Sequence, residues 1–204
     1  MHVSLAYRAV GEGPPLLVLH GLFASHANWW ALARQLADRR RVYCLDLRNH
    51  GRSPHAPTMT YAEMAADVHG FVAEHIGTAV EVAGHSMGGK VAMMLALTAP
   101  ELVTRVISVD IAPVACRDRH RPYIHAMQAL DLDTLASRAD AEAALAADVP
   151  DAGERSFLLT NLVQDDGGWR WRLNLDAIAA AMPAILGFPR SEEHTSELQS
   201  LLII

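Results

Sequence analysis

A serine between two glycines is the feature of this sequence best suited to chemistry. Ser86 lies in the segment Val82–Gly88, with Gly84 and Gly88 two residues to either side of it, which fits the pattern G-x-S-x-G. An apolar run precedes the segment and a helix-like run follows it, which predicts a strand, a sharp turn and a helix. Small residues are required there because the strand and helix backbones pass close together. A serine held in such a turn is typical of a nucleophile that attacks an acyl carbon.

A serine hydroxyl needs a base that takes its proton and an acid that orients the base. Asp110 is the best candidate for the acid, because it stands at the end of the strand-like run Val103–Ile111, where ligands bind in parallel sheets. A helix cap or a surface turn is the alternative interpretation. No histidine follows a late core strand: His120 and His125 fall in a helical region, and His194 lies in an unusual C-terminal segment. We therefore expect the catalytic histidine to be absent from this chain.

The C-terminal segment differs in character from everything before it. Arg190–Ser200 reads R-S-E-E-H-T-S-E-L-Q-S, which agrees at all eleven positions with the translation of a common short-read sequencing adapter. The preceding chain is rich in Ala and Arg with the single lysine Lys90, whereas the segment ends in Leu-Leu-Ile-Ile. We therefore expect residues 190–204 to be a non-native tail and the natural chain to be truncated at about Pro189.

The composition indicates one globular domain and argues against several classes of function. The chain has 204 residues, of which 51% are hydrophobic and 20% charged, enough for a sizeable core. A net charge of −6 argues against nucleic-acid binding. No apolar run approaches the roughly 18 residues of a membrane span, and the N-terminus lacks signal-peptide features. The expected location is cytoplasmic, and Cys44 and Cys116 do not make a disulfide framework.

Strand-like and helix-like runs alternate through the first half, which is typical of a parallel sheet with crossover helices. Thr60 and Glu63 have the spacing of a capping box at a helix start. From about residue 115 the pattern changes to short helices with one strand-like patch, Trp169–Arg172, as expected for an insertion over the carboxyl edge of the sheet. The expected strands are 2–9, 16–19, 42–47, 80–83 and 103–111, with helices at 27–37, after 60, and at 87–98.

Four motifs in this order resemble those of the alpha/beta hydrolase superfamily: His20–Phe23, Asp46–Ser53, Gly84–Lys90 and Val109–Pro113. More narrowly, they resemble its small bacterial esterases and thioesterases related to mitochondrial abhydrolase-domain proteins. The stretches 157–162 and 171–175 are similar to the lid of that subgroup. The resemblance implies an α/β fold, a mostly parallel sheet with helices on both faces and a helical lid. It divides the chain into hydrolase core (1–114), lid (115–181), return to the core (182–189) and tail (190–204), with the last strand–helix units missing.

The resemblance also implies the site. The backbone N–H groups of Leu22 and Met87 would form the oxyanion hole, with Phe23 less favoured than Leu22, and the loop Asp46–Ser53 would brace it. Many superfamily members place the acid one strand later than Asp110, and that strand is missing here. Because the strand that would pair next to Val103–Asp110 is missing, Val103–Asp110 is expected to become an edge strand of the sheet. The supporting residues would be His20, which holds the loop, together with Gly21, Phe23, Gly84, His85 and Gly88.

The implied function is a serine hydrolase that cleaves small-molecule carboxylic esters or thioesters through an acyl-enzyme on Ser86. No cofactor or metal is expected, because the histidines do not cluster with carboxylates at metal-ligand spacing. Haloalkane dehalogenases and epoxide hydrolases need aspartate at the position of Ser86, which argues against both. A carbon–carbon bond hydrolase, a cofactor-free peroxidase, an inactive truncated fragment and a non-catalytic scaffold stay open as alternatives. The sequence does not determine the oligomeric state.

Overall fold

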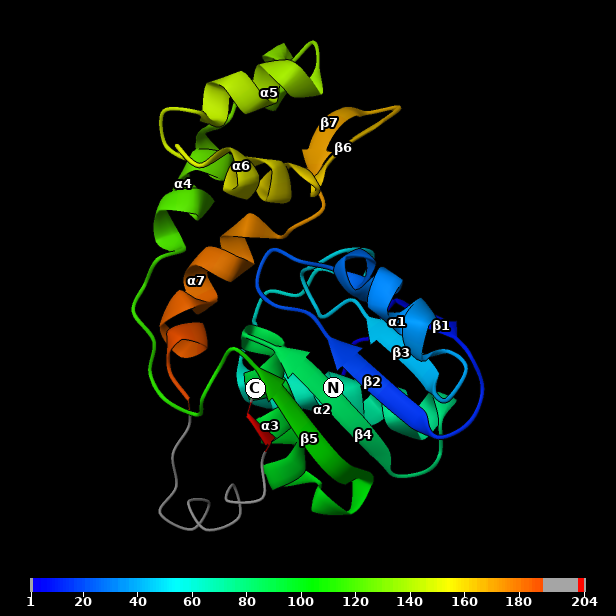
Figure 1. The fold of residues 1–204 in the computed structure, drawn as a ribbon. Coiled ribbons are helices and arrows are strands. Elements are labelled where there is room, and N and C mark those ends of the chain that lie inside the picture. The colour runs from blue at the N-terminus through cyan, green and yellow to red at the C-terminus, as the bar shows by residue number, and fades with distance from the viewer. Residues whose placement is uncertain (1, 189–201, 204) are drawn as a thin grey trace.

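A six-stranded sheet forms the base of the molecule in a computed structural model that describes residues 2–188 and 202–203 (Figure 1). The strand order is β1-β3-β2-β4-β5-β8, with β1 antiparallel to β3 and the other neighbours parallel. This confirms the predicted mostly parallel α/β fold. The strands are β1 Tyr7–Val10, β2 Pro15–Leu19, β3 Arg41–Leu45, β4 Val80–His85, β5 Val103–Val109 and β8 Leu202–Ile203.

Alternate residues of β2 serve two separate cores, one on each face of the sheet. Leu16 and Val18 pack with Ala33 of helix α1 (Trp30–Leu36), which follows a short 3-10 turn at His26–Trp29. On the opposite face, Leu17 and Leu19 join the larger core, which includes helices α2 (Tyr61–His75) and α3 (Met87–Thr98). The strand is therefore covered on both faces, as its continuous apolar sequence predicts.

The predicted start of α2 is confirmed in detail. The Thr60 side chain accepts a hydrogen bond from the Glu63 backbone N–H, and the Glu63 carboxylate accepts one from the Thr60 N–H at 2.8 Å. This reciprocal arrangement satisfies two amides that no helical carbonyl reaches. It fixes where the long loop after β3 ends and the helix begins.

The insertion after β5 forms a helical lid that stands above the sheet (Figure 1). Trp169–Arg172, expected to be strand-like, largely coincides with β7, which pairs antiparallel with β6 in a small hairpin. Helix α7 runs through residue 181, so the predicted boundary between lid and returning chain falls inside a helix. The lid elements are α4 Arg121–Ala129, a 3-10 turn at Leu132–Thr134, α5 Arg138–Leu145, α6 Ala152–Leu159, β6 Leu162–Asp165, β7 Gly168–Trp171 and α7 Leu175–Leu186.

The sequence predicts that β5 is an edge strand, and this prediction is wrong for two of its residues. The backbone of β8 pairs in parallel with β5 at Ile107 and Ser108, so these two residues are interior to the sheet. The remainder of β5 has no second strand neighbour among residues 2–188 and 202–203. Apart from Leu202–Ile203, the predicted tail 190–204 lies outside the described residues, and His194 lies there with it.

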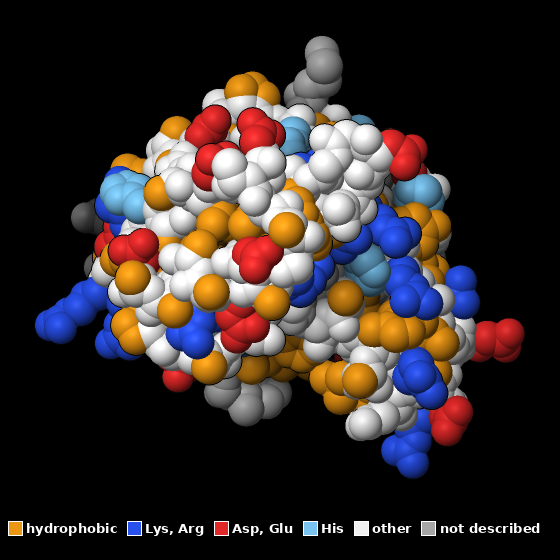
Figure 2. All heavy atoms as spheres, turned by 90° about the horizontal axis from the view of Figure 1, so that it is seen from above, with side chains coloured by type: hydrophobic (Ala, Val, Ile, Leu, Met, Phe, Trp, Pro, Cys, Tyr) orange, Lys and Arg blue, Asp and Glu red, His pale blue; other side chains and the backbone are white. Residues whose placement is uncertain are grey.

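Seen from above, charged side chains of both signs are scattered over the lid and core, with hydrophobic side chains exposed between them (Figure 2). Within the described chain, no helix combines the length and the apolar character that crossing a membrane requires.

Candidate active site

Ser86 occupies the sharp turn between β4 and α3 with an unusual backbone conformation. Its φ of 50° and ψ of −118° lie in a region that residues with a side chain rarely adopt. Three backbone hydrogen bonds hold it there: Ser86 N donates to Val109 O at 3.0 Å, and Ser86 O accepts from Gly89 N and Lys90 N at 2.9 and 3.3 Å. The turn is therefore a strained elbow whose serine side chain lines two cavities.

The glycines that flank the serine are dictated by backbone packing. A Cβ at Gly84 would lie 2.2 Å from Gly88 O, and a Cβ at Gly88 would lie 2.5 Å from Leu19 O. Both contacts are with backbone atoms, which a rotamer change cannot relieve. The strand β4, the helix α3 and the neighbouring strand β2 therefore meet at distances that only glycine permits.

The loop after β2 lies against the elbow and is held by His20. The His20 imidazole is fully buried; its Nε2 accepts a hydrogen bond from Leu47 N at 2.9 Å, and its Nδ1 lies 2.8 Å from Gly21 O. With Nε2 accepting, Nδ1 carries the proton and donates to Gly21 O. Burial lowers the pKa of His20, which favours this neutral form. His20 is thus engaged at both nitrogens in positioning the loop.

Two backbone amides lie in the lining of the cavity at Ser86, one in this loop and one at the start of α3. Leu22 and Met87 line the same cavity as Ser86, and within the described chain neither of their N–H groups donates to another protein atom. Unpaired amides beside a serine are the donors that an oxyanion requires. The next residue, Phe23, has a φ of 63° and is buried, so the loop turns sharply away behind Leu22.

A lid residue braces the loop after β2. Asn161, which follows α6, is buried, and its Nδ2 donates to Phe23 O at 2.7 Å and to Leu158 O at 3.2 Å. The sequence placed Asn161 in a lid-like stretch but gave it no role. Only the fold reveals the contact, because the two residues are 138 positions apart. The conformation of the loop therefore depends on the position of the lid.

Asp110 lies directly after β5, and the hydrogen bond from Ser86 N to Val109 O sets it beside the elbow. Its φ is 56°, its side chain is exposed, and it lines the same cavity as Ser86. Among residues 2–188 no protein donor reaches its carboxylate. The structure thus brings the predicted acid and the predicted nucleophile to one cavity.

His120 is a site residue that sequence reasoning did not select. It lies just before α4 and lines both cavities that contain Ser86, which measure about 390 and 460 Å³. Its ring packs edge-on against Phe23 with centroids 5.8 Å apart, and burial lowers the pKa of its imidazole. His85, at the end of β4, lines the second cavity and lies 6.2 Å, centroid to centroid, from Trp29. The spacing of His120 along the sequence carries no signal, since the lid folds back over the sheet.

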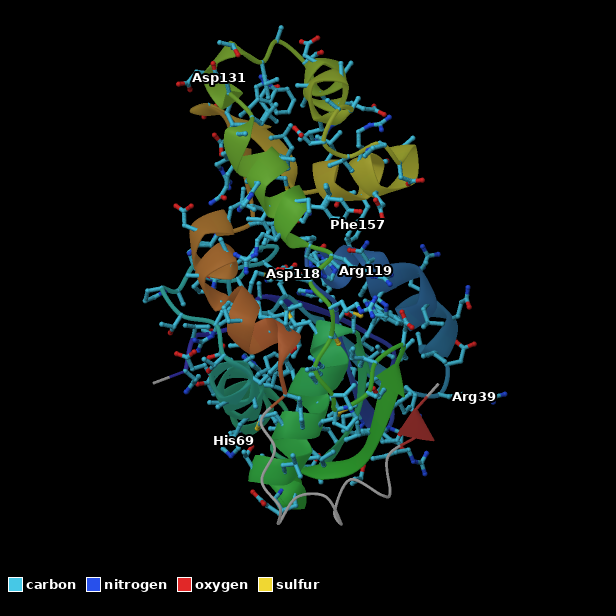
Figure 3. All side chains as sticks on the ribbon, turned by 90° about the vertical axis from the view of Figure 1, so that its left-hand side faces the viewer. Arg39, His69, Asp118, Arg119, Asp131 and Phe157 are labelled. Atoms are coloured by element: carbon cyan, nitrogen blue, oxygen red, sulfur yellow. The ribbon has the colours of Figure 1, made fainter. Side chains whose placement is uncertain are left out.

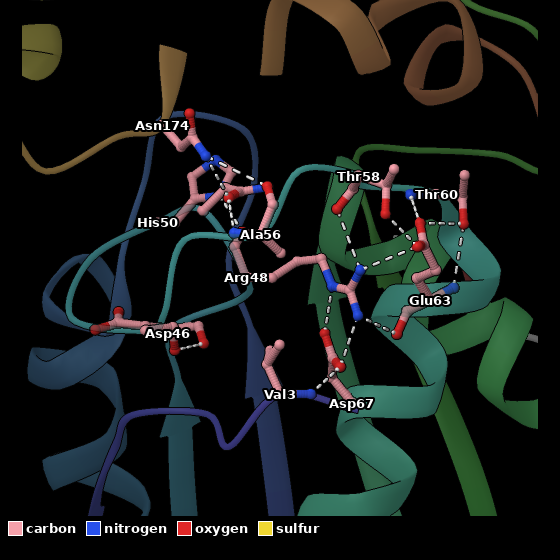
Figure 4. Close-up of polar contacts among 12 residues, drawn as sticks. Val3, Asp46, Arg48, His50, Ala56, Thr58, Thr60, Glu63, Asp67 and Asn174 are labelled. Carbon is pink, nitrogen blue, oxygen red and sulfur yellow. Dashed lines mark hydrogen bonds and ion pairs between the residues drawn. The ribbon is translucent and has the colours of Figure 1, made fainter. Parts of the chain in front are cut away.

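The loop Asp46–Ser53 is a buried scaffold beside the site (Figure 4). The Asp46 carboxylate accepts hydrogen bonds from the backbone amides of His26 and Arg52 at 2.7 and 2.9 Å. A Cβ at Gly51 would lie 2.2 Å from the Asp46 carboxyl carbon, so glycine is needed where the loop wraps around this side chain. The carboxylate is saturated by the loop and is not free for a substrate.

The same scaffold supports the lid. Arg48 pairs with Asp67 of α2 through bonds of 2.6 and 2.8 Å, and both side chains are buried (Figure 4). Asn174, at the start of α7, donates from its backbone N–H to Asn49 O at 3.1 Å. The loop therefore joins α2 to α7 and fixes the position of this lid helix.

In the part of the chain that the structure describes, no three His, Cys, Asp or Glu side chains gather as a metal site would require. Met127 and Trp171 are buried in the lid and line a different cavity from the one at Ser86.

Comparisons with known proteins agree with this geometry. A family profile described as alpha/beta hydrolase fold matches residues 14–153. The chain is 44% identical over 195 residues to sn-1-specific diacylglycerol lipase ABHD11 of Xenopus tropicalis, covering 92% of this chain and 61% of that protein. It is 34% identical over 178 residues to Esterase YbfF of Escherichia coli strain K12, covering 86% of this chain and 68% of that protein.

Among solved structures, a marine microorganism esterase superposes with a TM-score of 0.89 at 36% identity, covering 93% of this chain and 76% of that one. The chain spans about three fifths of the length of the diacylglycerol lipases that it matches.

Proposed function

The chain belongs to the alpha/beta hydrolase fold family, and from this premise we propose that its site is that of a serine hydrolase acting on carboxylic esters or thioesters. The observation that carries the proposal is the strained Ser86 beside two unpaired amides, those of Leu22 and Met87. The names of the similar proteins, which are lipases and esterases, support the same class of substrate.

In the proposed reaction, the Ser86 hydroxyl oxygen attacks the acyl carbon while a histidine takes its proton. The carbonyl oxygen becomes an oxyanion that accepts hydrogen bonds from the N–H groups of Leu22 and Met87. Collapse of this intermediate breaks the bond to the alcohol or thiol, which leaves with the proton and leaves an acyl group on Ser86. Water, deprotonated by the same histidine, then releases the acid. Asp110 orients the histidine and stabilises its charged form.

We assign no described histidine as the base. A base of this type is oriented by a carboxylate, and neither His85 nor His120 has such a partner among residues 2–188. The buried histidine–carboxylate pair that the structure does contain, His26 with Asp46 at 2.9 Å, does not line the cavities at Ser86. Without a described base, we propose that attack by Ser86 and release of its acyl group are both slow, so a single covalent reaction is followed in place of turnover.

The test is covalent labelling of the serine. An alkyl fluorophosphonate is incubated with the protein, and the added mass is located by peptide mapping. We expect one label, on Ser86, which is lost in Ser86→Ala and kept in Ser156→Ala, where an exposed serine of α6 is changed. Labelling elsewhere, or equal labelling of Ser86→Ala, would overturn the proposed function.

A further inference from the structure

The two cavities that meet at Ser86 and His120 differ in chemistry. The cavity of about 460 Å³ has no Lys, Arg, Asp or Glu in its described lining, where Trp29 and Phe157 lie with the polar side chain of Asn28. The cavity of about 390 Å³ contains Lys90, Arg117 and Arg119 against a single carboxylate, that of Asp110. The serine therefore lies between a cavity without acidic or basic side chains other than histidine and one with an excess of positive charge.

The arginines of the second cavity are not neutralised by their neighbours. Asp118 stands between them in the sequence, but its carboxylate accepts hydrogen bonds from Arg121 Nε at 3.0 Å and from the backbone N–H groups of His120 and Arg121. No carboxylate of residues 2–188 lies within ion-pair distance of Arg117 or Arg119. Figure 3 shows Asp118 and Arg119 where the chain passes from the sheet to the lid, with Phe157 above them in that view.

Lys90 adds a buried cation at the base of this cavity. Its side chain is almost fully buried, and Nζ donates to Gly187 O at 2.8 Å, to Leu186 O at 3.4 Å and to Cys116 Sγ at 3.5 Å. No carboxylate of the described chain lies within 4 Å of Nζ. Burying an ammonium group beside uncharged acceptors is unfavourable, and an anion in the adjoining cavity would offset that cost.

We propose that this cationic cavity binds an anionic group, a carboxylate or a phosphate, on the substrate, while the cavity of about 460 Å³ takes the uncharged half of the ester. The assignment of the anion as part of a substrate rests on the proposed function, whereas anion binding itself does not. Guanidinium groups suit both anions because their paired N–H donors match two oxygens at once. The Lys90 ammonium group adds a compact positive charge at the base of the same cavity.

Anion binding is measured first, by isothermal titration calorimetry with glutarate and, separately, with inorganic phosphate. The variants are Arg119→Gln, the double change Arg117→Gln with Arg119→Gln, and the conservative Arg119→Lys. The control is Arg39→Gln, because Arg39 is exposed and lies at the far edge of the core (Figure 3). Removing one guanidinium should weaken binding about five- to tenfold. Arg119→Lys should recover part of that loss, and Arg39→Gln should match the parent.

The two ligands distinguish the source of the anion. Tighter binding of glutarate assigns a carboxylate, and tighter binding of phosphate assigns a phosphate group. The proposal is overturned if neither binds below about 10 mM, or if the double variant binds as well as Arg39→Gln. Circular dichroism and the melting temperature show whether each variant is folded.

A second measurement links the anion site to the serine. Acylation of Ser86 is followed by mass spectrometry with 4-nitrophenyl hydrogen adipate and with its neutral shape match, 4-nitrophenyl 6-methylheptanoate. We expect the adipate ester to acylate faster, with the preference reduced about tenfold in the double arginine variant. Equal rates in the parent would overturn the placement of the anion on the substrate. No acylation by either ester, together with no fluorophosphonate label, would refute the proposed function and leave the calorimetric result to decide anion binding.

Discussion

The closest packing at the site gives the sharpest prediction. In Gly84→Ala, the new Cβ would lie 2.2 Å from Gly88 O, 2.4 Å from Gly88 C and 2.5 Å from Gly89 N. The N-terminal end of α3 would have to retreat by about 1 Å to restore an ordinary contact. That retreat disturbs a second tight contact, because Gly88 itself packs directly against Leu19 O of β2.

Overpacking against side chains costs about 1–3 kcal/mol, and backbone atoms relax less. We therefore expect Gly84→Ala to lose about 3 kcal/mol of unfolding free energy, equivalent to about 6–12 °C in melting temperature for a chain of this size. The rate of fluorophosphonate labelling should fall as well, since the same shift moves Ser86 and the Met87 amide.

The assay is thermal and urea unfolding of the parent, Gly84→Ala and Gly187→Ala. Gly187 is the matched control, because a Cβ there would meet its nearest atoms at 3.6 Å and its φ is −78°. The control should lie within about 0.5 kcal/mol of the parent. The reasoning is refuted if Gly84→Ala melts and labels as Gly187→Ala does.

Three further predictions concern the groups around the site. Burial lowers the pKa of His50 from 6.5 to about 3, so the unfolded chain binds the proton more readily than the folded chain. The free energy of unfolding should therefore fall as the pH drops from about 6.5 toward 3. In His50→Asn, the urea midpoint should fall less steeply over the same pH range. Asn161→Ala removes the donor to Phe23 O and should cost about 1 kcal/mol in urea unfolding and slow Ser86 labelling, whereas exposed Gln164→Ala should do neither. Asp67→Asn removes the buried carboxylate that pairs with Arg48, which leaves Glu63 at 3.3 Å as its carboxylate partner; the unfolding free energy should fall by about 3 kcal/mol, measured by urea denaturation.

Most features that could be predicted from the sequence depend on patterns of residues close together in the chain. The capping box at Thr60 and the turn at Ser86 depend on residues within a few positions of one another, so their structure could be predicted from the sequence. The continuous apolar run in β2 indicated a strand covered on both faces for the same reason.

The rest of the site depends on contacts between distant segments. His120 reaches the cavities, and Asn161 reaches Phe23, only because the lid folds back over the sheet. Neither placement has a periodicity or motif that could signal it. The same holds for the pairing of β8 with Ile107 and Ser108.

The bond from Asn161 to Phe23 O has a thermodynamic consequence. It joins the lid to the loop that carries the Leu22 amide, so the two segments share one conformational equilibrium. A ligand that favours the braced loop also favours the seated lid, and a ligand that lifts the lid weakens that bracing, because both effects express one coupling free energy. Under the proposed function, affinity in the compartment under the lid and the binding of an oxyanion analogue at the Leu22 and Met87 amides should therefore rise or fall together.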